Sequence, residues 1–348
     1  MASINPNPAT ATATAAAPPV FISTAAIQTL ITHKSLITHL QTTLPSLSAA
    51  IQSPIRHAHQ TSPTSSFLLM PSWSKSPSLP YIGTKLVTHH PQNSALNLPG
   101  VQAIYVLFSS TTGQPLASID ATELTLYRTA CVSALASNYL SREDSKTLVM
   151  IGAGSLAPHL IKAHLSVRQN IKHVVVWNRT IEKVQTLIEK LKTEDNQLKG
   201  VSFEANGCLE EAVRMGDIIS CATNSTMPLV KGVDLKKGAH LDLVGSFTPS
   251  MRECDDVAVG RGRVFVDNEV ALVEAGELVG AFERGVMRKD EIVGDLVELI
   301  KGEKIGRGDS DEITVFKSVG SAVVDLLSAQ VVYESYVGEN HVGHEVNV

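Results

Sequence analysis

A short apolar run that ends in two closely spaced glycines constrains this fold more than any other stretch. Residues 147–151 have the composition of a buried parallel strand, and Pro158 begins a helical pattern of apolar residues soon after. Between them lies the spacing G-x-G-x-x-A, formed by Gly152, Gly154 and Ala157. In such a spacing the first glycine makes a tight turn, the second lets a pyrophosphate approach the backbone, and the alanine keeps helix and strand close. The stretch predicts a dinucleotide site at a helix N-terminus.

The next predicted strand, residues 173–180, bears on which cofactor the site prefers. An acid that holds a ribose 2′-hydroxyl is expected about 20 residues beyond the glycines. That place holds Asn178, followed by Arg179 and Thr180. A neutral amide does not repel a 2′-phosphate, and a guanidinium pairs with it, so the sequence predicts NADPH, with NADH as the alternative. The competing interpretation is that Asn178 caps the following helix and Arg179 is a solvated charge.

Further predicted strands end in polar loops. Residues 217–222 run into Thr223, residues 240–244 run into Ser246, and residues 264–267 are predicted as the last strand. The carboxyl ends of such strands form the crevice where a doubly wound sheet binds its ligand. The residues expected to line the cofactor site are Gly152, Gly154, Ser155, Leu156, Asn178, Arg179, Thr180, Ala222, Thr223, Val244 and Ser246.

The chain divides into segments of different composition, and the fold class predicted from them is α/β. Residues 1–19 form an Ala/Thr/Pro tract with too few bulky side chains for a core, so we expect disorder there. Residues 20–141 begin with a helical pattern and continue as short strands between turns. They are predicted to form an α+β substrate domain together with residues 309–337, whose apolar residues have helical spacing. Residues 142–308 are predicted to form a Rossmann-type NAD(P) domain, and residues 338–348 a tail.

Composition excludes several classes of protein. A chain of 348 residues, 43% hydrophobic and 18% charged, suits two domains with full cores. The net charge of −5 contains no long block of like charge, so we expect no nucleic-acid partner. No apolar run reaches the roughly 20 residues of a membrane helix. Residues 1–19 lack the features of a secretory signal but share the absence of acids with transit peptides, so we expect plastid import, or otherwise a cytoplasmic location.

No metal site is predicted from the residues that most often bind metals. The cysteines lack the paired spacing of a zinc site or of a disulfide framework, and are expected to be reduced and mostly buried. Four histidines of the first segment lack neighbouring carboxylate or thiolate ligands. The residues concerned are Cys131, Cys208, Cys221, Cys254, His57, His59, His89 and His90.

Six motifs follow one another along residues 20–336. They are Thr84-Lys85-Leu86-Val87, Arg128-Thr129-Ala130, Ile151-Gly152-Ala153-Gly154, Val176-Trp177-Asn178-Arg179-Thr180, Arg252-Glu253-Cys254-Asp255-Asp256 and Thr314-Val315-Phe316-Lys317-Ser318-Val319-Gly320. Together they resemble the ornithine cyclodeaminase/mu-crystallin family, and most of all its plant member that makes pipecolate in systemic acquired resistance. The resemblance implies a homodimer in which each subunit joins a dimer-forming substrate domain to an NAD(P) domain.

The same resemblance implies three basic groups around a substrate carboxylate, here Arg56, Lys85 and Arg128. Lys85 and Arg128 also interrupt apolar surroundings, where an unpaired charge would be expensive. Arg56 lies in a polar stretch, so its assignment rests on the resemblance alone. Ornithine cyclodeaminases carry an aspartate in the loop after the strand at residues 241–244, whereas this chain has Phe247 there. We therefore expect no cyclodeaminase activity.

The function that the resemblance implies is NAD(P)H-dependent reduction of a cyclic ketimine carboxylate. The substrate is 1-piperideine-2-carboxylate or 1-pyrroline-2-carboxylate and the product L-pipecolate or L-proline, in lysine catabolism and plant defence. The crevice would align the reacting carbon while the basic groups hold the carboxylate. Hydroxyls that adjoin the motifs, on Thr84, Ser246 and Thr248, are the candidate proton donors. Two alternatives stay open: an amino-acid dehydrogenase that oxidises a linear substrate, and an NADPH-regulated protein that binds a small ligand, as mu-crystallin does.

Overall fold

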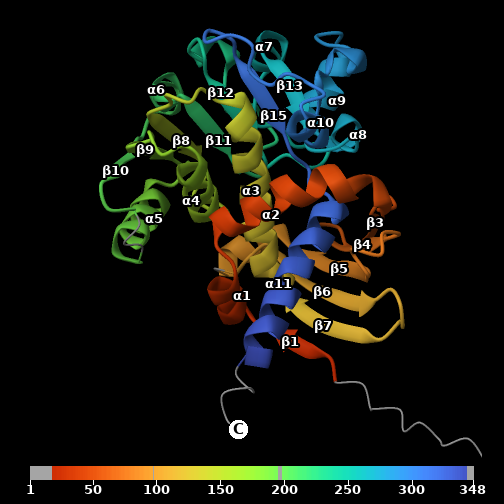
Figure 1. Ribbon diagram of the computed structural model, residues 1–348. Helices are drawn as coiled ribbons and strands as arrows, with labels where there is room; N and C mark the ends of the chain where they lie inside the picture. The colour runs from red at the N-terminus through yellow and green to blue at the C-terminus, as the bar shows by residue number, and fades with distance from the viewer. Residues whose placement is uncertain (1–17, 97, 195–197, 343–348) are drawn as a thin grey trace, which may run out of the picture.

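The computed structural model of the chain describes residues 18–96, 98–194 and 198–342, which form two sheets with helices around them (Figure 1). Most of the predicted Ala/Thr/Pro tract, residues 1–17, lies outside the described residues, as do residues 343–348 of the predicted tail. Among the helices described, none is long and apolar enough to span a membrane.

The first sheet is built from hairpins, as the turn-separated apolar runs predicted. Its strands lie in the order β1-β7-β6-β5-β4-β2, with β3 also paired to β4. All pairs are antiparallel except β1 with β7. The strands are β1 (Val20–Ile22), β2 (Ile51–Gln52), β3 (His57–Ser62), β4 (Ser65–Ser74), β5 (Tyr81–His89), β6 (Val101–Ser109) and β7 (Pro115–Asp120). The helical pattern expected from residue 20 was wrong for its first three residues, which form β1.

Helices cover one face of this sheet. They are α1 (Thr24–Leu30), α2 (His33–Leu47), α3 (Ala121–Leu140) and α11 (Ala322–Val342). Helix α11 crosses the face of β4 and β5, while α3 passes between the two sheets and contacts both β6 and β12 (Figure 1). Because it packs on both sides, most of its residues are buried. Asp120 caps its first turn by accepting hydrogen bonds from the amides of Thr122 and Glu123.

The second sheet is entirely parallel and confirms the predicted Rossmann-type fold. The strands lie in the order β10-β9-β8-β11-β12-β15-β13-β14. They are β8 (Thr147–Ile151), β9 (His173–Trp177), β10 (Ser202–Ala205), β11 (Ile218–Cys221), β12 (His240–Leu243), β13 (Arg263–Val266), β14 (Gly294–Asp295) and β15 (Thr314–Lys317). Alternate residues of β8 pack into different cores, Leu148 and Met150 into one and Val149 and Ile151 into the other. Burial on both faces explains the uninterrupted apolar run.

The remaining helices accompany this parallel sheet. They are α4 (Ala157–Val167), α5 (Ile181–Glu194), α6 (Leu209–Met215), α7 (Asp256–Arg261), α8 (Ala271–Glu274), α9 (Gly276–Glu283) and α10 (Leu296–Lys301). Short 3₁₀ helices occur at Ser48–Ala50, Pro91–Leu96, Gly232–Asp234 and Lys289–Glu291. Pro158 lies in the first turn of α4, as predicted. Cys131, Cys221 and Cys254 are buried, Cys208 is exposed, and none of the four forms a disulfide.

The end of the chain differs from the prediction. Residues 264–267 were expected to form the last strand and residues 309–337 to be helical, yet β15 lies between β12 and β13. Val315 and Phe316 are both fully buried, one in each core, which is the periodicity of a central strand. A short apolar run does not distinguish strand from helix by spacing, which explains the error. The segment after residue 308 therefore contributes a strand to the second sheet and a helix to the first.

Candidate active site

The glycine stretch has the geometry that a dinucleotide requires. Gly152 has φ of 110°, and a Cβ there would lie 2.6 Å from the carbonyl oxygen of Ala222, so only glycine fits. Gly154 borders open space, with no atom within 4 Å of where its Cβ would stand. Helix α4 has no side-chain N-cap, but the Ala157 amide donates to the Gly154 carbonyl at 3.0 Å and Pro158 has no N–H, so the amides left for an anion are those of the turn before the helix. A hollow of about 350 Å³ adjoins Ala153, Gly154 and Ser155.

The end of β9 presents an unengaged cation. Asn178 Nδ2 donates to the carbonyl of Thr180 at 3.0 Å, so the amide is directed at its own turn. Arg179 is exposed, and within the described ranges no hydrogen bond or ion pair engages its guanidinium. A free guanidinium at this position can accept a phosphate without first breaking another contact.

The ends of β11 and β12 form the other half of the crevice edge. Thr223 follows β11 after Ala222, and Val244 directly follows β12, with its amide donating to the carbonyl of Cys221 at 2.9 Å. Ser246 is fully buried, and its Oγ donates to the carbonyl of Met251 at 2.9 Å and accepts from the Gly276 amide at 3.3 Å. Its hydroxyl is therefore committed to loop structure and is a poor proton donor, although its backbone still lies at the edge.

The other two hydroxyls considered as proton donors are no better placed. Thr84 neighbours Lys85 on β5, so its side chain points to the opposite face of the sheet. Thr248 Oγ1 bonds Ser250 Oγ at 3.2 Å, in an exposed pair.

Two of the three predicted basic residues meet at one carboxylate. Lys85 projects from β5 and Arg128 from α3, and both contact Asp325 of α11. Lys85 Nζ lies 2.8 Å from Asp325 Oδ2 and 3.0 Å from Oδ1, while Arg128 Nε lies 3.0 Å from Oδ1. All three side chains are nearly inaccessible, at 3%, 8% and 2% exposure respectively. Two buried cations thus share one carboxylate.

Burial and neighbouring charges shift the pKa values of Lys85 and Asp325. Burial and then Arg128 lower the pKa of Lys85 to about 8, against the opposing effect of Asp325. Burial acts to raise the pKa of Asp325, but Lys85 and Arg128 outweigh it and hold that pKa below its ordinary value. At neutral pH the lysine is therefore an ammonium and the aspartate a carboxylate. The cations keep N–H groups that Asp325 does not use, and these can hold a second carboxylate.

The connection between β15 and α11 brings this cluster to the edge of the crevice. A Cβ on Gly320 would lie 2.9 Å from Arg128 Nη1, so the guanidinium packs directly on the loop. Gly320 has φ of 86°, which also favours glycine. Asp267, at the end of β13, fixes the loop by accepting from the amides of Val319 and Gly320 at 3.1 and 2.7 Å.

Arg56 contacts the same loop. Its Nη2 donates to the carbonyl of Val319 at 3.2 Å and pairs with Glu274 Oε2 at 2.8 Å. The charge of Arg56 also contributes to lowering the pKa values of Lys85 and Asp325. Arg56 and Arg128 thus contact the same loop, and Lys85 meets Arg128 at Asp325, which Arg56 does not touch.

Sequence reasoning missed Asp325 and Asp267. Asp325 lies 240 positions from Lys85, so no local motif links the two. A signal was nevertheless present, because Asp325 interrupts the apolar residues 322–327 in the same way that Lys85 interrupts its own strand. Asp267 carries no such signal, since acids at strand ends are ordinary turn residues.

Phe247, which the resemblance predicts to replace the aspartate of cyclodeaminases, packs against the first sheet. Its ring meets the ring of His89 edge-on, with centroids 5.7 Å apart. Burial, followed by the charge of His90, lowers the pKa of His89, so this contact is uncharged at neutral pH. The Phe247 ring thus packs against an uncharged imidazole. His57 and His59 lie on exposed β3, and no cluster of metal-binding side chains occurs among the residues described.

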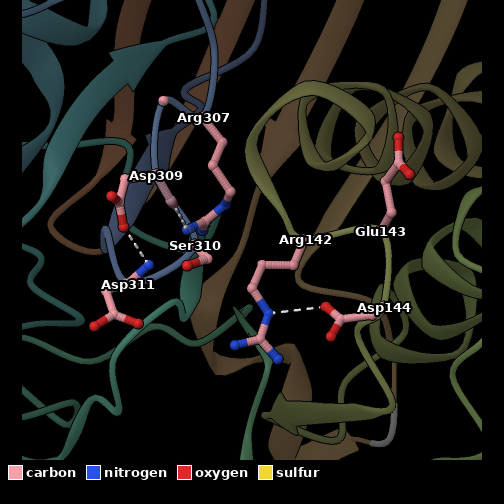
Figure 2. Close-up of a pocket in the computed structure, with 8 residues that line it drawn as sticks. Arg142, Glu143, Asp144, Arg307, Asp309, Ser310 and Asp311 are labelled. Carbon is pink, nitrogen blue, oxygen red and sulfur yellow. Dashed lines mark hydrogen bonds and ion pairs between the residues drawn. The ribbon is translucent and has the colours of Figure 1, made fainter.

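A hollow of about 530 Å³ lies near the amino ends of the second sheet's strands, away from the glycines (Figure 2). Its lining includes Arg142 and Arg307, whose guanidinium groups bind their own chain. Arg142 Nε pairs with Asp144 at 2.9 Å, and Arg307 Nε donates to the Leu140 carbonyl at 2.8 Å. Because ligands of such sheets bind at the carboxyl ends, we assign this hollow a structural role.

Comparison with known proteins gives consistent matches over almost the whole chain. A sequence model described as the ornithine cyclodeaminase/mu-crystallin family matches residues 18–340. Protein SAR DEFICIENT 4 of Arabidopsis thaliana is 57% identical over 322 residues, which cover 92% of this chain and 99% of that protein.

Two solved structures share the fold over similar lengths. The Δ1-pyrroline-2-carboxylate reductase of Thermococcus litoralis, in complex with NADH and L-proline, superimposes with a TM-score of 0.87 at 30% identity and covers 92% of this chain and 98% of its own. An archaeal alanine dehydrogenase dimer with bound NAD gives a TM-score of 0.83 at 28% identity, with 92% and 97% coverage.

Proposed function

The chain belongs to the ornithine cyclodeaminase/mu-crystallin family, and from this premise we propose that it reduces a cyclic ketimine carboxylate with NAD(P)H. The substrates are 1-piperideine-2-carboxylate or 1-pyrroline-2-carboxylate, and the products L-pipecolate or L-proline. Support comes from the Thermococcus litoralis relative, a reductase of the five-membered ring that binds NADH and L-proline. The observation that carries the proposal is the pair of buried cations, Lys85 and Arg128, beside the crevice edge.

Each element of the site has a role in this reaction. The nicotinamide cofactor, when bound, supplies the hydride. Lys85 and Arg128 bind the substrate carboxylate through donors that Asp325 leaves unused, while Arg56 reinforces the positive field at the loop. The ketimine reacts as its protonated iminium, whose nitrogen already carries the proton that the amine product keeps, so the hydride completes the reduction. Phe247 excludes water from this cationic ring without offering a base. A ring held by its carboxylate keeps the adjacent C=N carbon in one orientation, which is the positioning effect that hydride transfer needs.

The direct test is NADPH oxidation, followed by absorbance, with the six-membered and five-membered ketimine carboxylates in parallel. Turnover of either substrate supports the proposal, and the faster one sets the preferred ring size. An absence of turnover with both rings, in a protein that binds NADPH, would contradict it.

Two alternatives predict other outcomes in the same assay. An amino-acid dehydrogenase would turn over a 2-oxo acid with ammonia in preference to the rings. A small-ligand binding protein would bind NADPH and an aromatic ligand with no turnover. The buried cations favour the reductase over a purely hydrophobic binding protein, because capture of an apolar ligand does not require two costly buried charges.

NADPH preference is part of the proposal and rests on Arg179. We expect Arg179→Ala to raise the Kd for NADPH about 10- to 100-fold, the effect of losing one charge-assisted contact, and to leave the Kd for NADH nearly unchanged. The enhancement of dihydronicotinamide fluorescence on binding measures both constants. The matched control is Lys172→Ala, which removes an exposed cation at the opposite end of β9. Equal losses for both cofactors would show that Arg179 does not bind the 2′-phosphate.

We also propose a homodimer, formed through the face of the first sheet that the helices leave open. Strand register places its apolar side chains together, and several remain accessible, with Phe21 at 62% and Ile82 at 39% exposure. The apolar members of this open face include Phe21, Leu69, Trp73, Ile82, Leu86, Ile104, Val106 and Phe108. An apolar face of this size is typical of an interface, and the archaeal relative is a dimer.

Val106→Asp is expected to convert the dimer to monomer, because it places an unpaired charge at the centre of the open face. Light scattering coupled to gel filtration measures the mass. Val233→Asp is the matched control, since Val233 is 71% exposed on the 3₁₀ turn of the second domain and should leave the mass unchanged. A monomeric wild type, or a dimeric Val106→Asp variant, would contradict this interface.

The cellular role that we propose is pipecolate formation in plant defence, on the similarity to the Arabidopsis protein. Plastid import is proposed only from the composition of residues 1–19. A fluorescent fusion to the full chain, imaged with and without these residues, tests it.

A further inference from the structure

Glu253 is a fully buried carboxylate that the proposed reaction does not use. Its Oε1 accepts hydrogen bonds from the amide and the hydroxyl of Thr223, at 2.7 and 2.9 Å. Its Oε2 accepts from the amide of Gly245 at 2.7 Å. Thr223 follows β11 and Gly245 follows β12, so one side chain holds the loops after two neighbouring strands.

These loops are packed so tightly that Glu253 fixes their relative position. A Cβ on Gly245 would lie 2.1 Å from the carbonyl oxygen of Thr223 and 2.4 Å from Glu253 Oε1. Gly152, in the first loop of the crevice, similarly packs on the carbonyl of Ala222. The loops after β8, β11 and β12 are therefore in direct contact, with Glu253 beneath the last two.

A second layer of buried charge supports Glu253. Glu277 Oε1 accepts from the amide of Glu253 at 2.8 Å, and Glu277 Oε2 lies 3.6 Å from Nζ of Lys317, the last residue of β15. All three side chains are fully buried. Burial raises the pKa of Glu253 to about 7, against the opposing charge of Lys317. Buried charges are commonly neutral or unfavourable for stability compared with apolar packing, so stability alone does not explain two acids and a lysine here.

We infer that Glu253 is a positioning residue for the nicotinamide half of the cofactor. Strand order reverses between β8 and β11, and an extended dinucleotide lies across that point. With the adenosine half at the ends of β8 and β9, the other half lies at the ends of β11 and β12, whose loops Glu253 holds. The inference rests on the proposed function in taking a dinucleotide as the cofactor, but it does not depend on the substrate.

The experiment measures the binding of whole and half cofactors to the full chain. Glu253→Gln keeps the shape but offers one acceptor and one donor, so the amide of either Thr223 or Gly245 loses its partner. We expect the Kd for NADPH to rise about tenfold or more, and the Kd for 2′,5′-ADP, which lacks the nicotinamide half, to stay within about twofold of wild type. Titration calorimetry measures both constants.

The matched control is Glu298→Gln in the same domain. Glu298 also accepts a backbone amide, that of Asp295 at 2.9 Å, but it caps α10, which follows the edge strand β14. Neither Kd should change in this control. A parallel rise of both constants in Glu253→Gln would mean a general structural role, and no rise in either would mean that Glu253 does not position the cofactor; each result overturns the inference.

A measurement on the wild-type protein keeps the inference testable if the variant does not fold. NADPH should slow amide hydrogen exchange at Thr223 and Gly245, whereas 2′,5′-ADP should not. Equal protection by both ligands, or by neither, would overturn the inference. Failure of the proposed reaction is distinguishable, because it would appear as wild-type protein that binds NADPH with this pattern yet turns over neither ketimine.

Discussion

Arg128→Ala should lower kcat/KM for the ketimine by about 10³-fold. The substitution removes one of two buried cations and leaves Asp325 with Lys85 alone. Truncating one partner of a buried, hydrogen-bonded charge pair typically costs about 2–5 kcal/mol, which corresponds to about 30- to 5,000-fold. Steady-state kinetics with the preferred ketimine measure the loss. Lys85 and Arg128 form the proposed carboxylate clamp, which binds the substrate and not the cofactor. The Kd for NADPH should therefore change little.

A conservative variant and a distant one distinguish a substrate-binding role of Arg128 from a purely structural role. Arg128→Lys keeps the charge but loses the planar fork, so we expect an intermediate loss. Arg288→Ala removes an exposed guanidinium far along the second domain and should leave kcat/KM unchanged. Added guanidinium ion should partly restore Arg128→Ala, because it can enter the vacated site. If Arg128→Ala retains turnover within about tenfold of wild type, the carboxylate is held elsewhere.

The parts of the molecule that the sequence predicted are those with local signals. The strand, the glycine turn and the helix at residues 147–167 follow one another in the chain, so composition and spacing are sufficient to define them. The hairpins of the first sheet have turn residues between their strands, which makes them similarly predictable. The long-range contacts that the side chains of these segments make are not specified by any short-range pattern.

The parts that escaped prediction depend on contacts between distant segments. The apolar run of β15 is compatible with either a helix or a strand. It forms a strand because it pairs with both β12 and β13. Asp325 and Lys85 were both recognisable as charges in apolar surroundings, but the pairing itself required α11 to cross β5. Ser246 and Thr84 adjoin predicted motifs in sequence, yet one hydroxyl is committed to its own loop and the other side chain points away.

One short segment joins the two halves of the proposed site. Lys317 ends β15 within the buried charge layer under the cofactor loops, and Gly320, three residues on, packs against Arg128. Helix α11 then carries Asp325 to Lys85. A displacement of this connection would therefore move the carboxylate clamp relative to the crevice. Asp267 holds the connection in place by accepting three hydrogen bonds from residues 318–320.

Asp325→Asn should shift the pH dependence of the reaction as well as its rate. Asp325 opposes the burial and the Arg128 charge that lower the pKa of Lys85 to about 8. Without that carboxylate charge the pKa of Lys85 falls further, so the ammonium is lost at a lower pH. Wild-type kcat/KM should fall as pH rises through about 8, and in the variant this fall should begin about one pH unit or more lower. Profiles of kcat/KM from pH 5.5 to 9.5 measure it.

The shape of the profile separates this role from a loss of stability. A variant that was merely less folded would lose activity in proportion to its folded fraction, which circular dichroism measures at each pH, whereas loss of the ammonium leaves more activity per folded molecule at pH 6 than at pH 8. Asp242→Asn is the matched control, because Asp242 is equally buried but bonds His164 and Ser220 inside the second sheet. It should leave the midpoint of the alkaline fall unchanged. A midpoint unmoved in Asp325→Asn would show that Asp325 does not maintain the charge of Lys85, and that the clamp is set by Arg128 and burial alone.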